Sequence, residues 1–350
     1  MIATLREPAR NLPVTGAFDV VVAGGGIGGV AAAVAAARTG VSVCLLEKEC
    51  SLGGLATVGN VTVWLPICDG KGRQVIGGIG EELLRLAVHD LRQTNRAAGF
   101  VGVPACWEPG GDPAERQQTR FTSQFNPAAY ILGLELWVLD AGVKLMYDTR
   151  LCAVRRSRGK VTHVIVENKS GRSAIACRTA IDATGDADLC FLAGEETESL
   201  DCNVGAAWFY YLKEGAVHLH TSSRAFSANL RRDELKCPGY RGDDAEQVTE
   251  QVLDSRRLTR DECARLSAKY PETDIQPFAL PSIPCFRATR RLVGAQSLGE
   301  RDMHVWFEDA VCLTGDWRRR GPVFAITPAM LRGVANRNLL SVGRCMSADT

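Results

Sequence analysis

Two kinds of apolar pattern alternate in the first part of the chain. Phe18–Ala23 and Val41–Leu46 are short runs rich in β-branched residues, which is typical of strands buried in a parallel sheet. Between them, the alanine-rich segment Ala31–Arg38 predicts a helix, and Gly40 stands where a helix commonly ends. The pattern therefore predicts a β-strand, helix, β-strand unit.

A glycine cluster, GGGIGG at residues 24–29, separates the first strand from the helix and satisfies the pattern GxGxxG. In such a turn Gly24 allows the tight bend, Gly26 lets the backbone approach a pyrophosphate, and Gly29 lets the helix pack against the strand. The helix N-terminus stabilises phosphate charge. Glu47 ends the second strand and can accept hydrogen bonds from ribose hydroxyls. These features predict a dinucleotide-binding site.

The same apolar stretch also suggests a membrane anchor or a signal peptide. The glycines interrupt it before it reaches the ~20 apolar residues that span a bilayer. A signal peptide would not lead directly into a second strand that ends in a ribose-type acid. The dinucleotide interpretation is therefore preferred, with no membrane as partner.

Further along, the patterns predict several more elements. Residues 100–120, rich in proline and glycine, are expected to form a surface loop, and the polar stretch 233–270 a solvated helix. The other expected elements are a helix opening at Gly77–Leu84, a helix with Asn126 as N-cap and Pro127 as first residue, a strand Val143–Tyr147, a hairpin Val161–Glu167 and Arg172–Cys177, and a strand Thr179–Asp182.

Composition narrows the function classes. The 350 residues suffice for one large or two medium domains, and the net charge of +1 gives no reason to expect nucleic acid or an acidic membrane as partner. The 13 cysteines include no CxxC pair and no zinc-type spacing, so we expect free thiols in a cytoplasmic protein and no metal site. The oligomeric state stays open.

The βαβ unit alone leaves FAD and NAD open, since both carry an ADP half. Two more stretches, LGGLAT and IDATGDADL, bring the chain into resemblance with the FAD-dependent oxidoreductases whose FAD domain is shared with fumarate reductase flavoproteins. The resemblance covers the chain from about residue 18 to its end. Its motifs stand in order at Gly24–Gly29, Leu52–Thr57, Ile181–Leu189, Pro284–Gly294 and Asn338–Ser347.

The resemblance implies FAD bound in an extended form and an α/β fold. A Rossmann-like FAD-binding domain, with a parallel sheet and a small antiparallel layer, would be joined by an α+β cap domain for the substrate. Residues 1–17 would be a leader, residues 18–60, 141–194 and 331–350 the FAD domain, and residues 61–140 and 195–330 the cap.

The resemblance also implies a set of cofactor-binding residues. Asp186 stays open between a ligand contact and a cap for the next turn. The cofactor-binding set is Gly24, Gly26, Gly28, Gly29, Glu47, Lys48, Gly53, Gly54, Val154, Ala183, Thr184, Gly185, Asp186 and Gly343.

A flavin carries out the redox chemistry itself, so the protein supplies position and charge. Arg287, Arg290 and Arg291 are the catalytic candidates, because on a helix they would share one face and suit a carboxylate, a sugar acid or negative charge on the reduced flavin. Structural ion pairing is the alternative.

Other candidates have weaker support. His218 and His220 would share one side of a strand, and His304 would be either a proton donor or a buried core residue. Arg120 and Tyr130 flank the proline-rich loop and are candidates to clamp substrate. Residues 318–320 form an arginine run expected in solvent, and a redox disulfide between Cys68 and Cys106 is disfavoured.

The resembling family continues beyond the segment that ends here at Thr350, so we expect either a truncated chain, with weakened FAD binding, or a member of the family that does without the further segment. Gly343 and Arg344 stand where many relatives have Gly-Asp. The predicted function is hydride transfer between FAD and a small organic substrate, with an acid or a carbohydrate-derived molecule as the suggested class. The alternatives are a redox-inert FAD-binding protein and an NAD(P)-dependent oxidoreductase.

Overall fold

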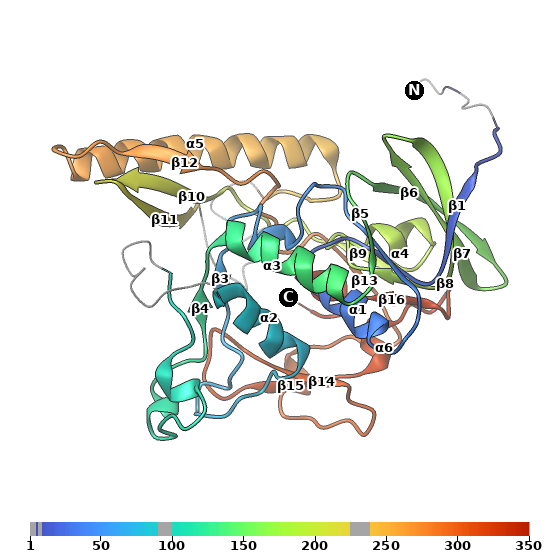
Figure 1. The fold of residues 1–350 in the computed structure, drawn as a ribbon, viewed down its shortest axis with the longest axis horizontal. Helices are drawn as coiled ribbons and strands as arrows, with labels where there is room; N and C mark the ends of the chain where they lie inside the picture. The colour runs from blue at the N-terminus through green and yellow to red at the C-terminus, as the bar shows by residue number, and fades with distance from the viewer. Residues whose placement is uncertain (1–4, 6–8, 90–99, 225–238, 350) are drawn as a thin grey trace.

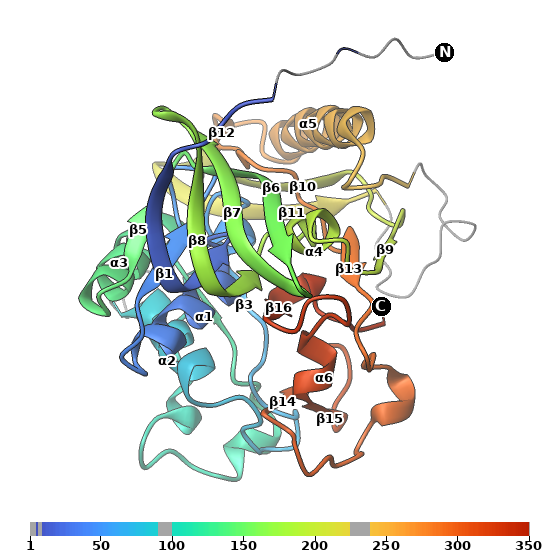
Figure 2. The same cartoon turned by 90° about the vertical axis from the view of Figure 1, so that its right-hand side faces the viewer.

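The largest sheet of the computed structural model (Figure 1) has seven strands, and the structure describes residues 5, 9–89, 100–224 and 239–349. Strand β1 (Val14–Ala23) lies between β2 (Val43–Leu46) and β8 (Gly171–Asp182), parallel to both. β5 (Lys144–Met146) extends the parallel part beyond β2, and β16 (Leu339–Ser341) pairs in parallel with β8. Figure 2 shows β1 and β8 side by side.

An antiparallel layer continues the sheet on the other side of β8. It consists of β7 (Lys160–Asn168) and β6 (Arg150–Ser157). The first part of β8 pairs with β7, whereas its last residues pair with β16. The predicted parallel sheet with a small antiparallel layer is thus confirmed. The two strands expected at 172–177 and 179–182 are one continuous strand, because β1 pairs along nearly its whole length.

Strand β1 also begins earlier than its sequence suggests. Residues 14–17, expected in a loose leader, belong to the strand, and Val14 pairs with Ala174. Pairing with a strand far along the chain gives this short, glycine-containing segment a regular structure that its own pattern does not predict.

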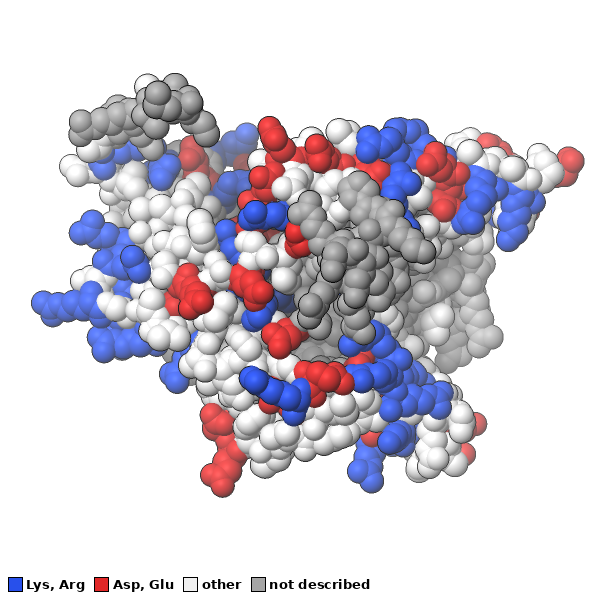
Figure 3. Space-filling view, turned by 180° about the vertical axis from the view of Figure 1, so that it is seen from behind, with Lys and Arg blue, Asp and Glu red and all other residues white. Residues whose placement is uncertain are grey.

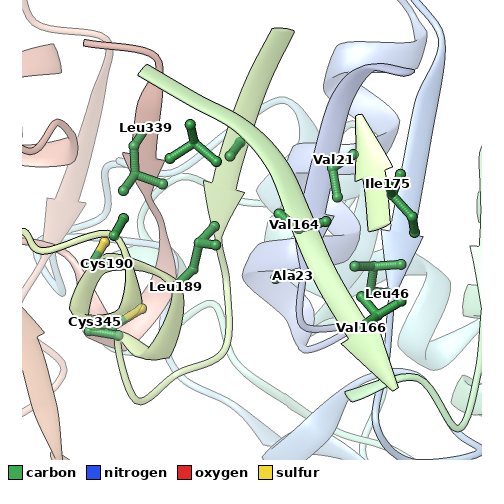
Figure 4. Close-up of a cluster of buried hydrophobic side chains, with 14 of the residues drawn as sticks. Val21, Ala23, Leu46, Val164, Val166, Ile175, Leu189, Cys190, Leu339 and Cys345 are labelled. Carbon is green, nitrogen blue, oxygen red and sulfur yellow. The ribbon is translucent and has the colours of Figure 1, made fainter. Parts of the chain in front are cut away.

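Both faces of the parallel strands are buried, as expected where helices or another layer cover each side. Along β1, Val22 faces the cluster formed with α1 (Ile27–Ala37), α2 (Ile79–Val88) and α3 (Pro127–Asp140). Val21 on the same strand faces the antiparallel layer. Figure 4 shows that second cluster, which joins residues of β1, β2, β7 and β8 to α4 (Asp188–Leu192) and β16.

Helix α3 begins as its sequence predicts. The Asn126 side-chain oxygen accepts hydrogen bonds from the N–H groups of Ala128 (2.9 Å) and Ala129 (3.4 Å), and Pro127 is the first helical residue. The side chain thereby satisfies two of the donors that a helix start leaves open.

The second part of the molecule is the predicted α+β unit. Strands β11 (Ala216–Ser223), β10 (Ala206–Lys213) and β12 (Gln276–Ala279) form a three-stranded sheet, and α5 (Ala245–Lys269) runs along it (Figure 1). The polar helix expected within 233–270 is α5. The part of that expectation before residue 239 lies outside the described residues.

Short two-stranded pairs complete the fold around these two parts. They are β3 (Val63–Trp64) with β4 (Ser123–Gln124), β9 (Thr197–Ser199) with β13 (Arg290–Leu292), and β14 (Cys312–Gly315) with β15 (Val323–Ile326), followed by α6 (Pro328–Leu331).

The surface carries charges of both signs. Acidic and basic side chains are interspersed on the face shown in Figure 3. Among the described residues, no helix is long and apolar enough to cross a membrane, and no group of side chains is arranged to hold a metal ion. Every cysteine in the described part of the chain is free.

Leu339 tests the role of β16 in the core. Its side chain is fully buried in the cluster of Figure 4, so Leu339→Ala is expected to lower the free energy of unfolding by roughly 2–5 kcal/mol. Urea unfolding measures the change. Leu136→Ala is the control: Leu136 is 63% exposed, and we expect a change within about 0.5 kcal/mol. Equal effects would show that β16 is not part of the core.

Candidate functional site

The parallel strands bring several loops to one edge of the sheet. The residues Gly24, Glu47, Ala183 and Val342 directly follow the carboxyl ends of β1, β2, β8 and β16. Ligands of open α/β sheets bind at this edge. A cavity of about 750 Å³ lies there and is lined by residues of all four loops.

Gly24 and Gly29 have the geometry that the sequence predicts for a tight turn and for close packing of the helix. Gly24 has a positive φ of 106°, and a Cβ there would lie 2.3 Å from the Ala183 carbonyl oxygen. A Cβ on Gly29 would lie 1.9 Å from the Gly24 carbonyl oxygen, so only glycine lets α1 pack this closely. A Cβ on Gly26 would meet nothing within 4 Å, and Gly26 lines the cavity. Its bare backbone is open to a ligand.

Two other glycine turns meet the first one. The Gly53 N–H donates to the Gly25 carbonyl oxygen at 2.8 Å, and a Cβ on Gly54 would lie 3.3 Å from the Gly26 Cα. A Cβ on Gly28 would lie 3.2 Å from the Cα of Gly343. Segments far apart in the sequence therefore build one glycine-lined wall.

Helix α1 starts at this wall. Its N-cap is Gly26, no side chain caps it, and its first turn holds no acidic residue. The N–H groups of a helix start and the helix dipole favour an anion such as a phosphate.

Glu47 is a buried acid beside the same turn, with 7% of its surface exposed. Its Oε2 accepts from the Gly25 N–H at 2.6 Å and its Oε1 from the Glu49 N–H at 2.8 Å. Burial raises the pKa of Glu47, while these two hydrogen bonds oppose that rise. Each carboxylate oxygen keeps acceptor capacity, so Glu47 both fixes the turn and faces the cavity.

Asp182, which sequence reasoning missed, holds the turn after β8. Its Oδ1 accepts from the Thr184 N–H (3.0 Å) and hydroxyl (2.7 Å), and its Oδ2 accepts from the Cys190 N–H (2.8 Å). Burial raises the pKa of this fully enclosed carboxyl. The sequence signal for this residue was an acid at the last position of an apolar strand. Through its hydrogen bonds Asp182 orients Ala183, Thr184 and Gly185, all of which line the cavity.

Asp186 is anchored to Arg344, another residue that sequence reasoning did not select. Its Oδ1 accepts from Arg344 Nη2 at 2.8 Å and from the Thr289 hydroxyl at 2.6 Å. Arg344 also donates to the Gly185 and Phe286 carbonyl oxygens, each at 2.6 Å. The N-cap of α4 is Ala187, without a side-chain cap, so the capping role for Asp186 is wrong.

The three arginines proposed for catalysis do not share a helix face. Arg290 and Arg291 lie on strand β13, where neighbouring side chains point to opposite sides. Arg290 binds Asp188 at 2.6 Å, and Arg291 binds Glu198 at 2.6 Å. Pairing with the distant strand β9, which periodicity cannot reveal, makes this segment a strand.

Arg287 lies near the cavity without lining it. Its guanidinium carbon is 5.8 Å from the centre of the Trp317 ring. Burial and the neighbouring Arg318 lower its pKa. None of the three arginines belongs to the cavity wall.

The remaining candidates divide between cavity and core. Lys48 lines the cavity, whereas Val154 packs against the core cluster and its strand neighbour Leu151 lines the cavity instead. Tyr130 is fully buried in the core and cannot clamp substrate. Arg120 donates to the Trp317 carbonyl oxygen at 3.1 Å.

The histidines do not gather at the cavity. His220 pairs with Glu262 at 3.1 Å, and His218 stacks on Tyr211 with ring centres 5.3 Å apart. His304 is exposed with a positive φ of 61°, so it is not the core histidine expected. Cys68 and Cys106 are buried and unbonded to each other.

This geometry defines a dinucleotide-binding cradle at the carboxyl edge of a parallel sheet. A sequence model of the family described as FAD dependent oxidoreductase matches residues 19–201, which is more than half of the chain. The chain belongs to this FAD-dependent oxidoreductase family. Its cofactor is therefore FAD. The relation to fumarate reductase flavoproteins stays a prediction.

Several solved structures are similar to part of this chain. One is a geranylgeranyl bacteriochlorophyll reductase-like protein from Thermoplasma acidophilum (16% identity, TM-score 0.39, 58% of this chain and 50% of that one). Another is CabE, an aromatic hydroxylase from angucycline biosynthesis (14% identity, TM-score 0.43, 80% of this chain and 54% of that one). A third is 3-ketosteroid delta1-dehydrogenase from Sterolibacterium denitrificans (16% identity, TM-score 0.36, 57% of this chain and 58% of that one). The chain spans about half the length of these proteins. No curated protein matches the chain.

Asp316, next to the cavity residue Trp317, forms ion pairs with two neighbouring arginines. It binds Arg318 at 3.0 Å and Arg319 at 2.8 Å. Burial alone would raise the pKa of Asp316, but hydrogen bonds from Arg318 and Arg319 outweigh it and lower the pKa to about 2. The carboxylate is therefore charged at neutral pH.

This pKa predicts a pH-dependent contribution to stability. A lowered pKa in the folded state stabilises the fold above the unfolded value of 3.8 and loses that effect as the pH falls through about 2. Asp316→Asn is expected to cost about 2 kcal/mol of unfolding free energy at pH 7 and about half as much at pH 3. Urea unfolding at both pH values measures this. A cost that does not change with pH would contradict the assignment.

Proposed function

We propose that the protein binds FAD extended along the cavity and transfers a hydride between FAD and a small organic substrate. One observation supports this above the others: three glycine turns meet the uncapped N-terminus of α1 and leave its backbone open. A diphosphate needs this close approach and this concentration of N–H donors.

The described residues fit the parts of FAD. The Gly24–Gly29 turn and the start of α1 would hold the diphosphate, and Glu47 would accept the ribose hydroxyls with its remaining lone pairs. Gly53, Gly54 and Gly343 would border the rest of the cofactor, where side chains would obstruct it. FAD, when bound, accepts or returns a hydride.

The protein's own part is to bind, orient and shield. Besides the FAD motifs, the cavity is lined by residues from 61–67, 283–286 and 314–317. We propose that the substrate lies between these segments and the cofactor. Arg287, Arg290 and Arg291 do not line the cavity, so they give no support to an acidic or carbohydrate-derived substrate.

Gly26→Ala tests the cradle without disturbing the fold. An added Cβ meets no protein atom within 4 Å and enters the wall of the cavity. We expect unchanged thermal stability of the FAD-free protein and at least about tenfold weaker FAD binding, measured by calorimetric titration. Gly102→Ala, where a Cβ also meets nothing within 4 Å, is the control away from the cavity. Equal FAD affinity in both variants would sink the proposed cradle.

Hydride transfer is tested on the FAD-loaded protein. Under anaerobic conditions, a panel of organic donors should include compounds that bleach the oxidised-flavin absorbance with matching formation of oxidised product. If FAD is bound and is reduced by dithionite but by no donor in the panel, while no oxidised compound restores its colour, the proposed hydride transfer is refuted.

A further inference from the structure

The cavity has two walls of opposite chemical character. Among the residues that the structure describes, charged side chains line it only at positions 47–49, 150, 186, 188 and 344, which lie in or beside the FAD-binding motifs. A second set of lining residues, which we call the uncharged wall, consists of Val61, Val63, Trp64, Leu65, Pro66, Ile67, Ile76, Phe125, Gly242, Val248, Ile283, Pro284, Phe286, Thr314, Gly315 and Trp317. Among the described residues, that wall contains no charged side chain.

Large apolar side chains dominate the uncharged wall. They are Trp64, Leu65, Ile76, Phe286 and Trp317. Thr314 supplies its only hydroxyl among the described residues, and that hydroxyl reaches the Gly315 carbonyl oxygen at 3.4 Å. The wall therefore offers aromatic and aliphatic surface with little hydrogen-bonding capacity.

Cations close to this wall are engaged elsewhere. Arg318 and Arg319 bind the buried carboxylate of Asp316. Arg120 donates to the Trp317 carbonyl oxygen, and Arg287 lies against the Trp317 ring outside the cavity lining. Among the described residues, Arg344 reaches this wall at the Phe286 carbonyl oxygen, but its positive charge is already paired with Asp186.

We infer that the substrate of this enzyme is a neutral, apolar molecule with a flat ring system. This inference rests on the proposed function, because it places the substrate against the uncharged wall beside bound FAD. Burying a carboxylate there without a partner is costly, whereas apolar surface is driven into such a site by release from water. Indole and phenyl side chains favour ring-shaped ligands, since aromatic rings pack in stacked and edge-to-face pairs.

The competing possibility is that the flavin ring alone covers this wall. Binding of a probe to the FAD-loaded protein separates the two, because a wall already filled would accept no further ring. The probes are 2-naphthylmethanol and 2-naphthoate, which have the same ring and similar size but differ in charge. A third probe, glucuronate, represents a carbohydrate-derived acid. The readout is the shift that binding causes in the visible absorbance of the bound flavin.

We expect 2-naphthylmethanol to bind at least about tenfold more tightly than 2-naphthoate, and glucuronate to cause no shift. Tighter binding of either acid overturns the inference, and so does the absence of any shift with 2-naphthylmethanol. If the protein takes up no FAD at all, the proposed function fails first, and the inference falls with it. FAD content, measured before each titration, distinguishes these failures.

Leu65 offers a matched variant. It lines the uncharged wall and is 49% exposed, so Leu65→Glu is compatible with folding. We expect this change to weaken 2-naphthylmethanol binding at least about tenfold and to leave FAD content unchanged. Leu136→Glu, at a 63% exposed position on α3 outside the cavity lining, is the control and should alter neither. Equal probe affinities in the two variants would overturn the placement of the substrate on this wall.

Discussion

The close packing of α1 against the end of β1 is the constraint on which the rest of the site depends. A Cβ on Gly29 would lie 1.9 Å from the Gly24 carbonyl oxygen, and one on Gly24 would lie 2.3 Å from that of Ala183. With glycine at both positions, the start of α1 lies directly beside the turns after β2 and β8. The buried carboxylates of Glu47 and Asp182 then fix these turns by accepting backbone N–H groups. The glycine packing and these hydrogen bonds together determine the shape of the cradle.

Charged and apolar side chains occupy different parts of the cavity lining. Backbone donors and charged side chains gather along the sheet edge, where the FAD motifs lie, and the opposite wall is apolar. Arg344 connects the two: it binds Asp186 and Gly185 on the FAD side and the Phe286 carbonyl oxygen on the other. Arg344 thereby fastens the segment of Phe286 to the turn after β8.

Local pattern predicts the parts of the fold that depend on local contacts. The βαβ unit, the Asn126 cap of α3, the hairpin of β7 and β8 and the glycine roles follow from spacing within short stretches. Pairings between distant segments carry no such signal. For this reason β1 begins before Phe18, and the segment with Arg290 and Arg291 is a strand against β9. For the same reason the sequence did not point to Arg344, whose partners lie about 60 and 160 residues away. The suggested substrate class likewise rested on arginines that do not reach the cavity.

A crystal structure of the FAD-loaded protein tests the cradle most directly. The diphosphate should lie at the N-terminus of α1, within hydrogen-bond distance of backbone N–H groups of the Gly24–Gly29 turn and the start of the helix. A ribose hydroxyl should donate to Glu47, and the flavin ring should lie toward the apolar wall. FAD bound with its diphosphate away from α1, or with Glu47 out of reach of the ribose, would contradict this arrangement.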